Sequence, residues 1–161
     1  MIRDHGRRTI VAFVLFAASM LAGALPAEAA DDPASASRLV YQRFVAAQNT
    51  GDLAAVEAIL LDSPNFLWVS DGMSIWGRDA TLARMALFQQ AEIWHVDPDL
   101  AKAVAVPLDD KTAFLHLPLV LAIGSKPGGV DRVKFLVSVL CIETAQGWRI
   151  AALFTTGDKT S

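Results

Sequence analysis

Cysteine and positive charge are both scarce in this sequence, and each scarcity excludes a class of protein. The 161 residues include one cysteine, and the formal net charge at pH 7 is −3. A single cysteine cannot form an internal disulfide or a multi-cysteine metal cluster. A nucleic-acid-binding protein needs a basic patch to neutralise phosphates, so the charge balance argues against a nucleic-acid partner. No nucleophile motif, phosphate-binding loop or nucleotide fingerprint occurs.

The beginning of the chain has the pattern of an export signal. Three arginines within the first eight residues precede an uncharged, mostly apolar run over residues 9–25, and Ala27 and Ala29 have the spacing that signal peptidase prefers. The run is shorter than the ~20 apolar residues that a membrane-spanning helix needs. We predict a cleaved signal peptide over residues 1–29 and a periplasmic or secreted protein whose mature form has no membrane association. The general secretory route fits better than the twin-arginine route.

The remaining sequence predicts a single domain in which three helices precede a β-rich region. Residues 30–37 are small and polar and are expected to form a flexible lead-in. Periodic apolar residues mark the expected helices, and polar or glycine-containing turns separate the expected strands. Helices are predicted over residues 38–50, 53–61 and 79–91, a hairpin over residues 66–76, and strands over residues 101–108, 112–124, 130–144 and 148–156.

The composition of the longest strands predicts a sheet that is covered on both faces. Residues 135–142 are apolar except for Ser138. A sheet with one solvated face would alternate polar and apolar residues, and this segment does not. The helices account for one face, and a partner subunit is the simplest cover for the other. We therefore predict a homodimer that forms through the sheet, and we expect Cys141 to be a small buried hydrophobic residue.

Three short motifs follow in a characteristic order along these elements. They are Asn49-Thr50-Gly51-Asp52-Leu53 after the first helix, Gly77-Arg78 before the third helix, and Gly147-Trp148-Arg149-Ile150 at the start of the last strand. Together they resemble the nuclear transport factor 2-like fold, with SnoaL-like proteins as the nearest group. The resemblance implies an α+β cone over residues 38–158. In that cone a strongly bent, mostly antiparallel sheet wraps around a long N-terminal helix, with two further helices and an internal pocket.

The first helix also looks like the opening helix of ketosteroid isomerases, but the isomerase residues do not carry over. That chemistry needs a carboxylate base and an oxyanion hole made of a tyrosine and a protonated aspartate. In this sequence the tyrosine position falls on Phe44, the base position nearest Val69, and the second acid near Ser138. Asp71 could approach the base position only if the hairpin shifted by two residues. The resemblance therefore implies the fold without this catalytic set.

His116 is the first candidate for chemistry, with Asp71 as the second candidate catalytic residue. His116 lies in the middle of an apolar strand, and an imidazole can serve as a general acid or base. Strand alternation places Phe114, His116 and Pro118 on one face and leucines on the other. We predict that the histidine face lines the pocket and that the leucine face is packing. The alternative is a buried histidine held by a backbone carbonyl.

Aromatic residues are numerous enough to line a pocket for a flat apolar molecule. The alternative is that they belong to an ordinary core. The predicted ligand-binding residues are Tyr41, Phe44, Trp68, Trp76, Phe88, Trp94 and His116. No cofactor and no metal are predicted, because the spaced ligand types in His95, Asp97 and Asp99 surround a proline in a segment expected to be irregular and solvated.

Two functional hypotheses remain open at this point. One is an exported protein that binds a small hydrophobic molecule in an internal pocket. The other is a cofactor-independent isomerase, dehydratase or hydrolase-type enzyme that uses His116 as an acid–base group. The fold by itself does not choose between them, since one fold can host both kinds of site.

Overall fold

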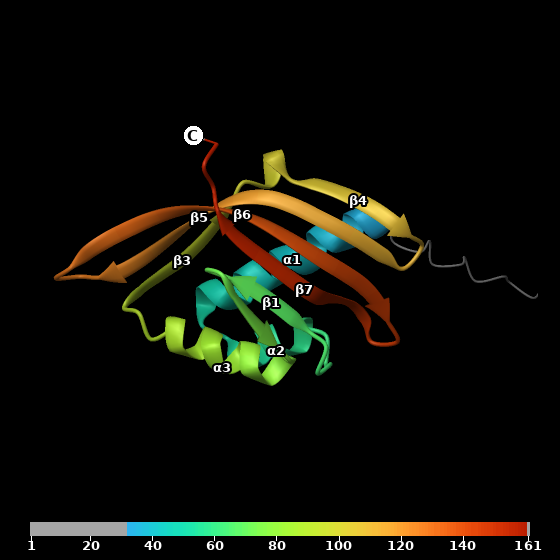
Figure 1. Ribbon diagram of the computed structural model, residues 1–161, viewed down its shortest axis with the longest axis horizontal. Coiled ribbons are helices and arrows are strands. Elements are labelled where there is room, and N and C mark those ends of the chain that lie inside the picture. Colours follow the sequence, from blue (N-terminus) through green and yellow to red (C-terminus); the bar gives the residue numbers. More distant parts are fainter. Residues whose placement is uncertain (1–31, 161) are drawn as a thin grey trace, which may run out of the picture.

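The computed structural model describes residues 32–160, so the predicted signal peptide lies outside the described residues. Three α-helices, one short 3₁₀ helix and a seven-stranded sheet make up these residues (Figure 1). The elements are α1 (Pro33–Thr50), α2 (Leu53–Ile59), β1 (Leu67–Ser70), β2 (Met73–Trp76), α3 (Arg78–Phe88), β3 (Ile93–Pro98), η1 (Leu100–Lys102), β4 (Val104–Asp109), β5 (Thr112–Ser125), β6 (Gly129–Thr144) and β7 (Gly147–Gly157).

Helix α1 begins five residues earlier than predicted. Its N-terminus is capped by Asp32, whose carboxylate accepts a hydrogen bond from the backbone N–H of Ser35 at 3.0 Å, and Pro33 occupies the first helical position. Residues 33–37, which we expected to be a flexible lead-in, are therefore the first turns of the helix. The helix ends at Thr50 and is capped by Gly51, whose φ of 69° is the left-handed conformation that glycine adopts without strain.

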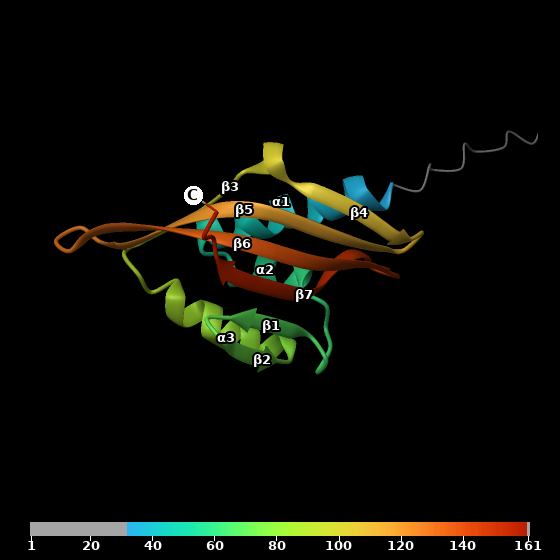
Figure 2. The same ribbon diagram turned by 45° about the horizontal axis from the view of Figure 1, so that its top comes forward.

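The sheet is mostly antiparallel and curls around α1. Its strand order is β2-β1-β7-β6-β5-β3, with β4 paired to β5, and the β1–β7 pair is parallel. Figure 2 shows the long β5–β6 hairpin crossing the molecule above the helices. In this hairpin fourteen residue pairs are in register, from Thr112↔Ile142 to Ser125↔Gly129. The predicted α+β fold, with a bent sheet and three helices, is confirmed.

Two segments differ from the sequence expectation. Residues 93–98 form strand β3, where an irregular segment was expected, because they pair with the edge of β5 from Ile93↔Gly124 to Pro98↔Leu119. The proline does not interrupt this pairing, since it is the last residue of the strand. Helix α3 begins at Arg78, one residue earlier than predicted, and its N-cap residue is Gly77, whose φ is 87°.

The sheet has two faces, which we call the inner face, toward α1, and the outer face, away from α1. The inner face packs against α1 and includes Leu115 and Leu117, both fully buried in the core cluster with Tyr41 of α1. The outer face carries the residues that alternate with these along each strand. Cys141 is buried in the same core, and burial raises the pKa of its thiol to about 12. This thiol is therefore a packing group, as expected for a small buried hydrophobic residue.

Asn49 joins the C-terminal end of α1 to strand β3 through two hydrogen bonds. Its side-chain Nδ2 donates to the carbonyl oxygen of Val96 at 2.9 Å, and its Oδ1 accepts from the N–H of Val96 at 2.7 Å. Val96 is buried, so both of its backbone groups would lose their partners without this side chain. The amide therefore attaches the edge strand to the central helix.

We expect Asn49→Ala to lower the free energy of unfolding by about 2–3 kcal/mol, because it leaves a buried donor and acceptor unsatisfied. Urea unfolding measures the change as a lower midpoint with an unchanged slope. The matched control is Asn65→Ala in the exposed turn before β1, which should change the stability by less than about 0.5 kcal/mol. Equal stability of the two variants would contradict the assigned role of Asn49.

Candidate functional site

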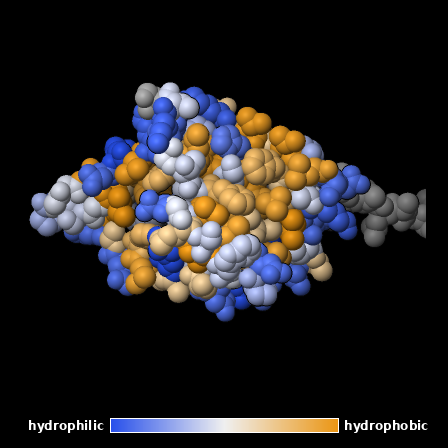
Figure 3. Space-filling view, in the orientation of Figure 1, coloured by the Kyte–Doolittle hydropathy of each residue, from blue (hydrophilic) through white to orange (hydrophobic). Residues whose placement is uncertain are grey.

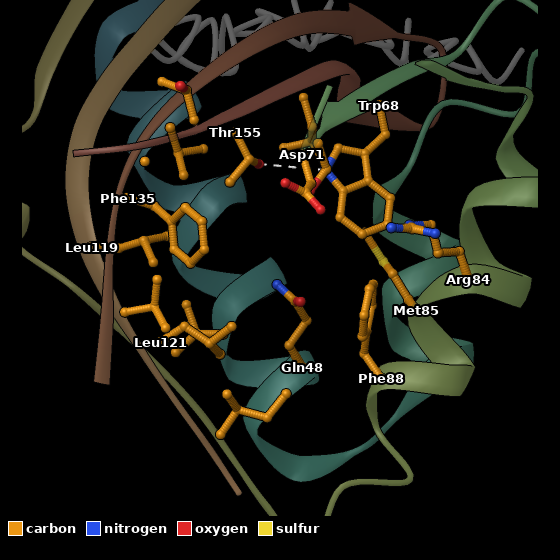
Figure 4. A pocket seen from close by; sticks show the side chains of 18 of the residues that line it. Gln48, Trp68, Asp71, Arg84, Met85, Phe88, Leu119, Leu121, Phe135 and Thr155 are labelled. Atoms are coloured by element: carbon orange, nitrogen blue, oxygen red, sulfur yellow. Dashed lines mark hydrogen bonds between the residues drawn. The ribbon is translucent and has the colours of Figure 1, made fainter. Parts of the chain in front are cut away.

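A cavity of about 740 Å³ lies between α1, α3 and the inner face of the sheet. Figure 4 shows side chains from these elements turned toward a common space, with Gln48 rising from α1 and Phe88 facing it from α3. Strands β1 and β3 complete the lining through Trp68 and Trp94. The cavity is thus formed by segments that are far apart in the sequence.

The leucine face of β5 lines this cavity. Leu119 pairs with Phe135 and Leu121 pairs with Val133, and directly paired residues lie on the same face of a sheet. These four residues form a continuous apolar wall. The prediction that the leucine face is only packing, and that the histidine face lines the pocket, is therefore wrong.

His116 lies on the outer face, away from the cavity. Its register partner is Ser138, and its Nδ1 lies 2.9 Å from the Ser138 hydroxyl. The neighbouring residues Leu115 and Leu117 point to the inner face, so alternation sends the imidazole to the other side. The structure consequently does not bring His116 together with the predicted ligand-binding aromatics.

Five of the predicted aromatic residues line the cavity, and one does not. The five are Tyr41, Phe44, Trp68, Phe88 and Trp94. The prediction was wrong for Trp76, which is 59% exposed. Its register explains the difference: Trp68 pairs with Ile75, so Trp76 pairs with Leu67 and lies on the opposite face of the β1–β2 hairpin.

Three of these aromatic rings form a cluster at one side of the cavity. Phe88 and Trp94 stack with their centroids 6.0 Å apart, and Trp68 meets Phe88 edge-on at 6.3 Å. The indole N–H of Trp68 donates to the Thr155 hydroxyl at 3.4 Å, which holds the ring against β7 (Figure 4). The cluster offers flat, rigid apolar surface, of the kind that packs well on a planar molecule.

A few polar groups interrupt the apolar lining. Gln48 is only 8% exposed and its amide is turned into the cavity (Figure 4). The indole Nε1 of Trp94 and the Nε of Arg84 are buried and have no hydrogen-bond partner within residues 32–160. Burial also raises the pKa of Tyr41 above its usual value, so this phenol stays neutral. Apolar walls with a small number of polar groups are typical of small-molecule sites.

Gln48 and Arg84 were not among the predicted site residues, although helical spacing offered a signal for both. Gln48 follows Phe44 by four residues and Arg84 precedes Phe88 by four, so each shares a helix face with an aromatic residue that had been assigned to the pocket. Apolar periodicity alone does not single out polar residues at such positions.

Asp71 lies at the turn between β1 and β2 and lines the cavity where the hairpin reaches it. Its backbone has a φ of 51°, in the left-handed region that aspartate tolerates better than most residues. The residue is exposed. Its predicted catalytic role stays a prediction.

The other charged candidates lie elsewhere. His95 and Asp97 are exposed on β3, and Asp99 caps η1 through the N–H of Lys102. Residues 32–160 contain no cluster of three or more histidine, cysteine, aspartate or glutamate side chains that could hold a metal ion. No helix in this same range combines the length and apolar composition needed to span a membrane.

Comparison with known structures identifies the fold. A protein described as uncharacterised with a cystatin-like fold, from Caulobacter vibrioides, matches with a TM-score of 0.68 and 20% identity, over 80% of this chain and 91% of that one. A nuclear transport factor 2-like superfamily protein from Salmonella enterica matches with a TM-score of 0.70 and 13% identity, over 78% and 91% of the two chains. A ketosteroid isomerase-like protein from Erwinia carotovora matches with a TM-score of 0.65 and 17% identity, over 79% of this chain and 97% of that one.

These identities are low enough that they show the fold alone. No curated protein matches the chain in a sequence comparison. The model of the SnoaL-like domain, in contrast, matches residues 38–153, which is most of the chain and includes every cavity-lining residue of α1 and α3. The chain therefore belongs to the SnoaL-like domain family.

Proposed function

We propose that this protein binds a small, largely apolar molecule in the cavity between α1, α3 and the inner face of the sheet. The observation that carries the proposal is the lining itself, in which a continuous apolar wall and an aromatic cluster surround a nearly buried amide at Gln48 that is turned into the cavity. The volume of about 740 Å³ falls within the roughly 300–1,000 Å³ of small-molecule sites. A ligand of that size would cover apolar surface and give the polar atoms partners.

The position of His116 gives no support to the alternative of acid–base catalysis by this residue. Its imidazole faces away from the cavity and has the Ser138 hydroxyl as a partner. A proton carrier must lie within hydrogen-bond reach of the group that it serves. Binding is therefore the function that the arrangement supports best.

The binding proposal predicts that filling the cavity removes binding. In Leu121→Trp the indole should occupy the space next to Phe135. The affinity for a neutral fluorescent probe, N-phenyl-1-naphthylamine, should fall by at least about tenfold, or about 1.4 kcal/mol. Probe fluorescence measures the affinity. The control Val120→Trp adds the same ring one residue away, on the other face of β5, and should leave the affinity unchanged.

Thermal unfolding should show that both tryptophan variants are folded before their affinities are compared. Failure of the unsubstituted protein to bind the probe would contradict the proposed function. An equal loss of probe affinity in Leu121→Trp and Val120→Trp would mean that the probe binds outside the cavity.

We also propose that the outer face forms a homodimer. Val104, Val106 and Leu108 of β4 and Phe154 of β7 are exposed apolar residues on this side of the sheet. Figure 3 shows hydrophobic residues gathered over the same side of the molecule. The polar groups of His116 and Ser138 are already paired with each other, so a second copy could cover them without leaving either unsatisfied. A two-fold contact between identical patches is the commonest arrangement of soluble oligomers.

Light scattering after size exclusion should give a dimer mass at micromolar concentration for the mature protein. Val106→Glu places a charge in the apolar patch and should raise the dimer dissociation constant by at least about tenfold. Leu87→Glu is the matched control, because Leu87 is an exposed apolar residue on α3 and lies off this face. A monomer mass for the unsubstituted protein would refute the dimer.

We further propose that the protein is exported and processed after Ala29, on the basis of the basic, apolar and small-residue segments of residues 1–29. The intact mass of protein recovered from the periplasm or the culture medium should correspond to a chain that begins at Ala30. A recovered mass that includes Met1 would exclude this cleavage.

A further inference from the structure

Arg84 is an arginine without an acidic partner inside the wall of the cavity. No ion pair and no side-chain hydrogen bond of Arg84 occurs within residues 32–160, and its Nε is buried. Arg78 on the same helix shows the usual alternative, since its guanidinium lies 3.3 Å from Glu57 and 3.2 Å from Asp62. A half-buried guanidinium in a cavity lining without an acidic partner is free to take a bound anion as its partner.

The guanidinium of Arg84 is held in place by aromatic rings. Its Cζ lies 4.9 Å from the centroid of Phe88 and 5.8 Å from that of Trp68. Figure 4 shows the group beside the Trp68 ring at the edge of the cavity. Contacts of this kind restrict a planar guanidinium to one orientation. An oriented fork of N–H groups is suited to receive a carboxylate by two hydrogen bonds.

Two other charged residues line the cavity, and neither neutralises Arg84. Asp71 is exposed at the hairpin turn and lies beyond ion-pair distance from the guanidinium. Lys159, near the C-terminal end of the described chain, adds a second positive charge to the lining and is also exposed. Water can solvate both exposed groups, whereas Arg84 is half-buried in the cavity lining and has no acidic partner within residues 32–160.

The rest of the cavity lining indicates the chemistry of the remaining part of the ligand. The wall formed by Leu119, Leu121 and Phe135 offers only apolar contact, and the rings of Phe88 and Trp94 offer a flat surface. The amide of Gln48 is neutral and can hydrogen-bond to a carbonyl or hydroxyl group of the ligand.

From this arrangement we propose that the cavity ligand is an apolar, ring-containing carboxylate whose carboxylate pairs with Arg84. This inference rests on the proposed binding function and adds the chemical class of the ligand. Arg84 sets the preference for an anion, and the apolar wall and the aromatic cluster hold the ring.

The test compares 1-naphthaleneacetate with 1-naphthaleneacetamide, which have nearly the same shape and differ in charge. Calorimetric titration of the mature protein measures each affinity directly. We expect the acid to bind about ten- to a hundredfold more tightly than the amide, the range expected for a charge-assisted hydrogen bond. In Arg84→Gln this ratio should fall to about one, while Arg84→Lys should retain part of it.

Arg43→Gln is the matched control, because Arg43 is an exposed arginine of α1 that does not line the cavity. It should leave the acid-to-amide ratio unchanged. Binding of the neutral N-phenyl-1-naphthylamine probe, measured on every variant, reports the cavity independently of charge and confirms that Arg84→Gln is folded.

Equal affinity of the acid and the amide, or a preference that survives Arg84→Gln, overturns the carboxylate assignment while probe binding keeps the binding function intact. If the unsubstituted protein binds neither the probe nor either naphthalene compound, the binding function and the ligand class fail together. A preference for the acid that is lost in Arg84→Gln and kept in Arg43→Gln supports the assignment.

Discussion

The register of the β5–β6 hairpin is the constraint on which both surfaces of this molecule depend. Fourteen consecutive pairs lock each residue of β5 to one of β6, and the pleat sends alternate side chains to opposite faces. A shift of one residue would exchange the two sets, moving Leu119 and Leu121 to the outside and His116 to the inside. The cavity wall and the outer apolar patch are thus consequences of the same pairing.

Helix α1 decides which of these faces becomes the interior. Its buried side, which includes Tyr41 and Phe44, packs on the inner face, and Asn49 attaches its C-terminal end to β3. Helix α3 then covers the remaining opening at a distance that leaves about 740 Å³ between its aromatic side and the sheet. The packing cost of an unfilled apolar space is substantial, so its retention is itself an argument for use.

The polar atoms inside this cavity distinguish it from a packing defect. A defect would be lined by apolar groups alone, because buried polar atoms without partners are costly. Here a nearly buried amide at Gln48 is turned into the space, and the polar side chain of Arg84 also lines it. Their shared location is the basis of the binding proposal, since one fold can host both binding and catalytic sites.

Most of the helices, the hairpin and the long strands could be predicted from local pattern, because periodicity, capping residues and turn chemistry act over a few neighbouring residues. The same applies to Cys141 as a packing residue and to the five aromatic residues that line the cavity. Alternation also separated the histidine and leucine faces of β5 correctly. It could not say which face would be covered by α1, because that depends on contacts between residues about seventy positions apart. Strand β3, the outward position of Trp76 and the meeting of Arg84 with Trp68 were decided in the same way, by pairing and packing between distant segments that no local pattern records.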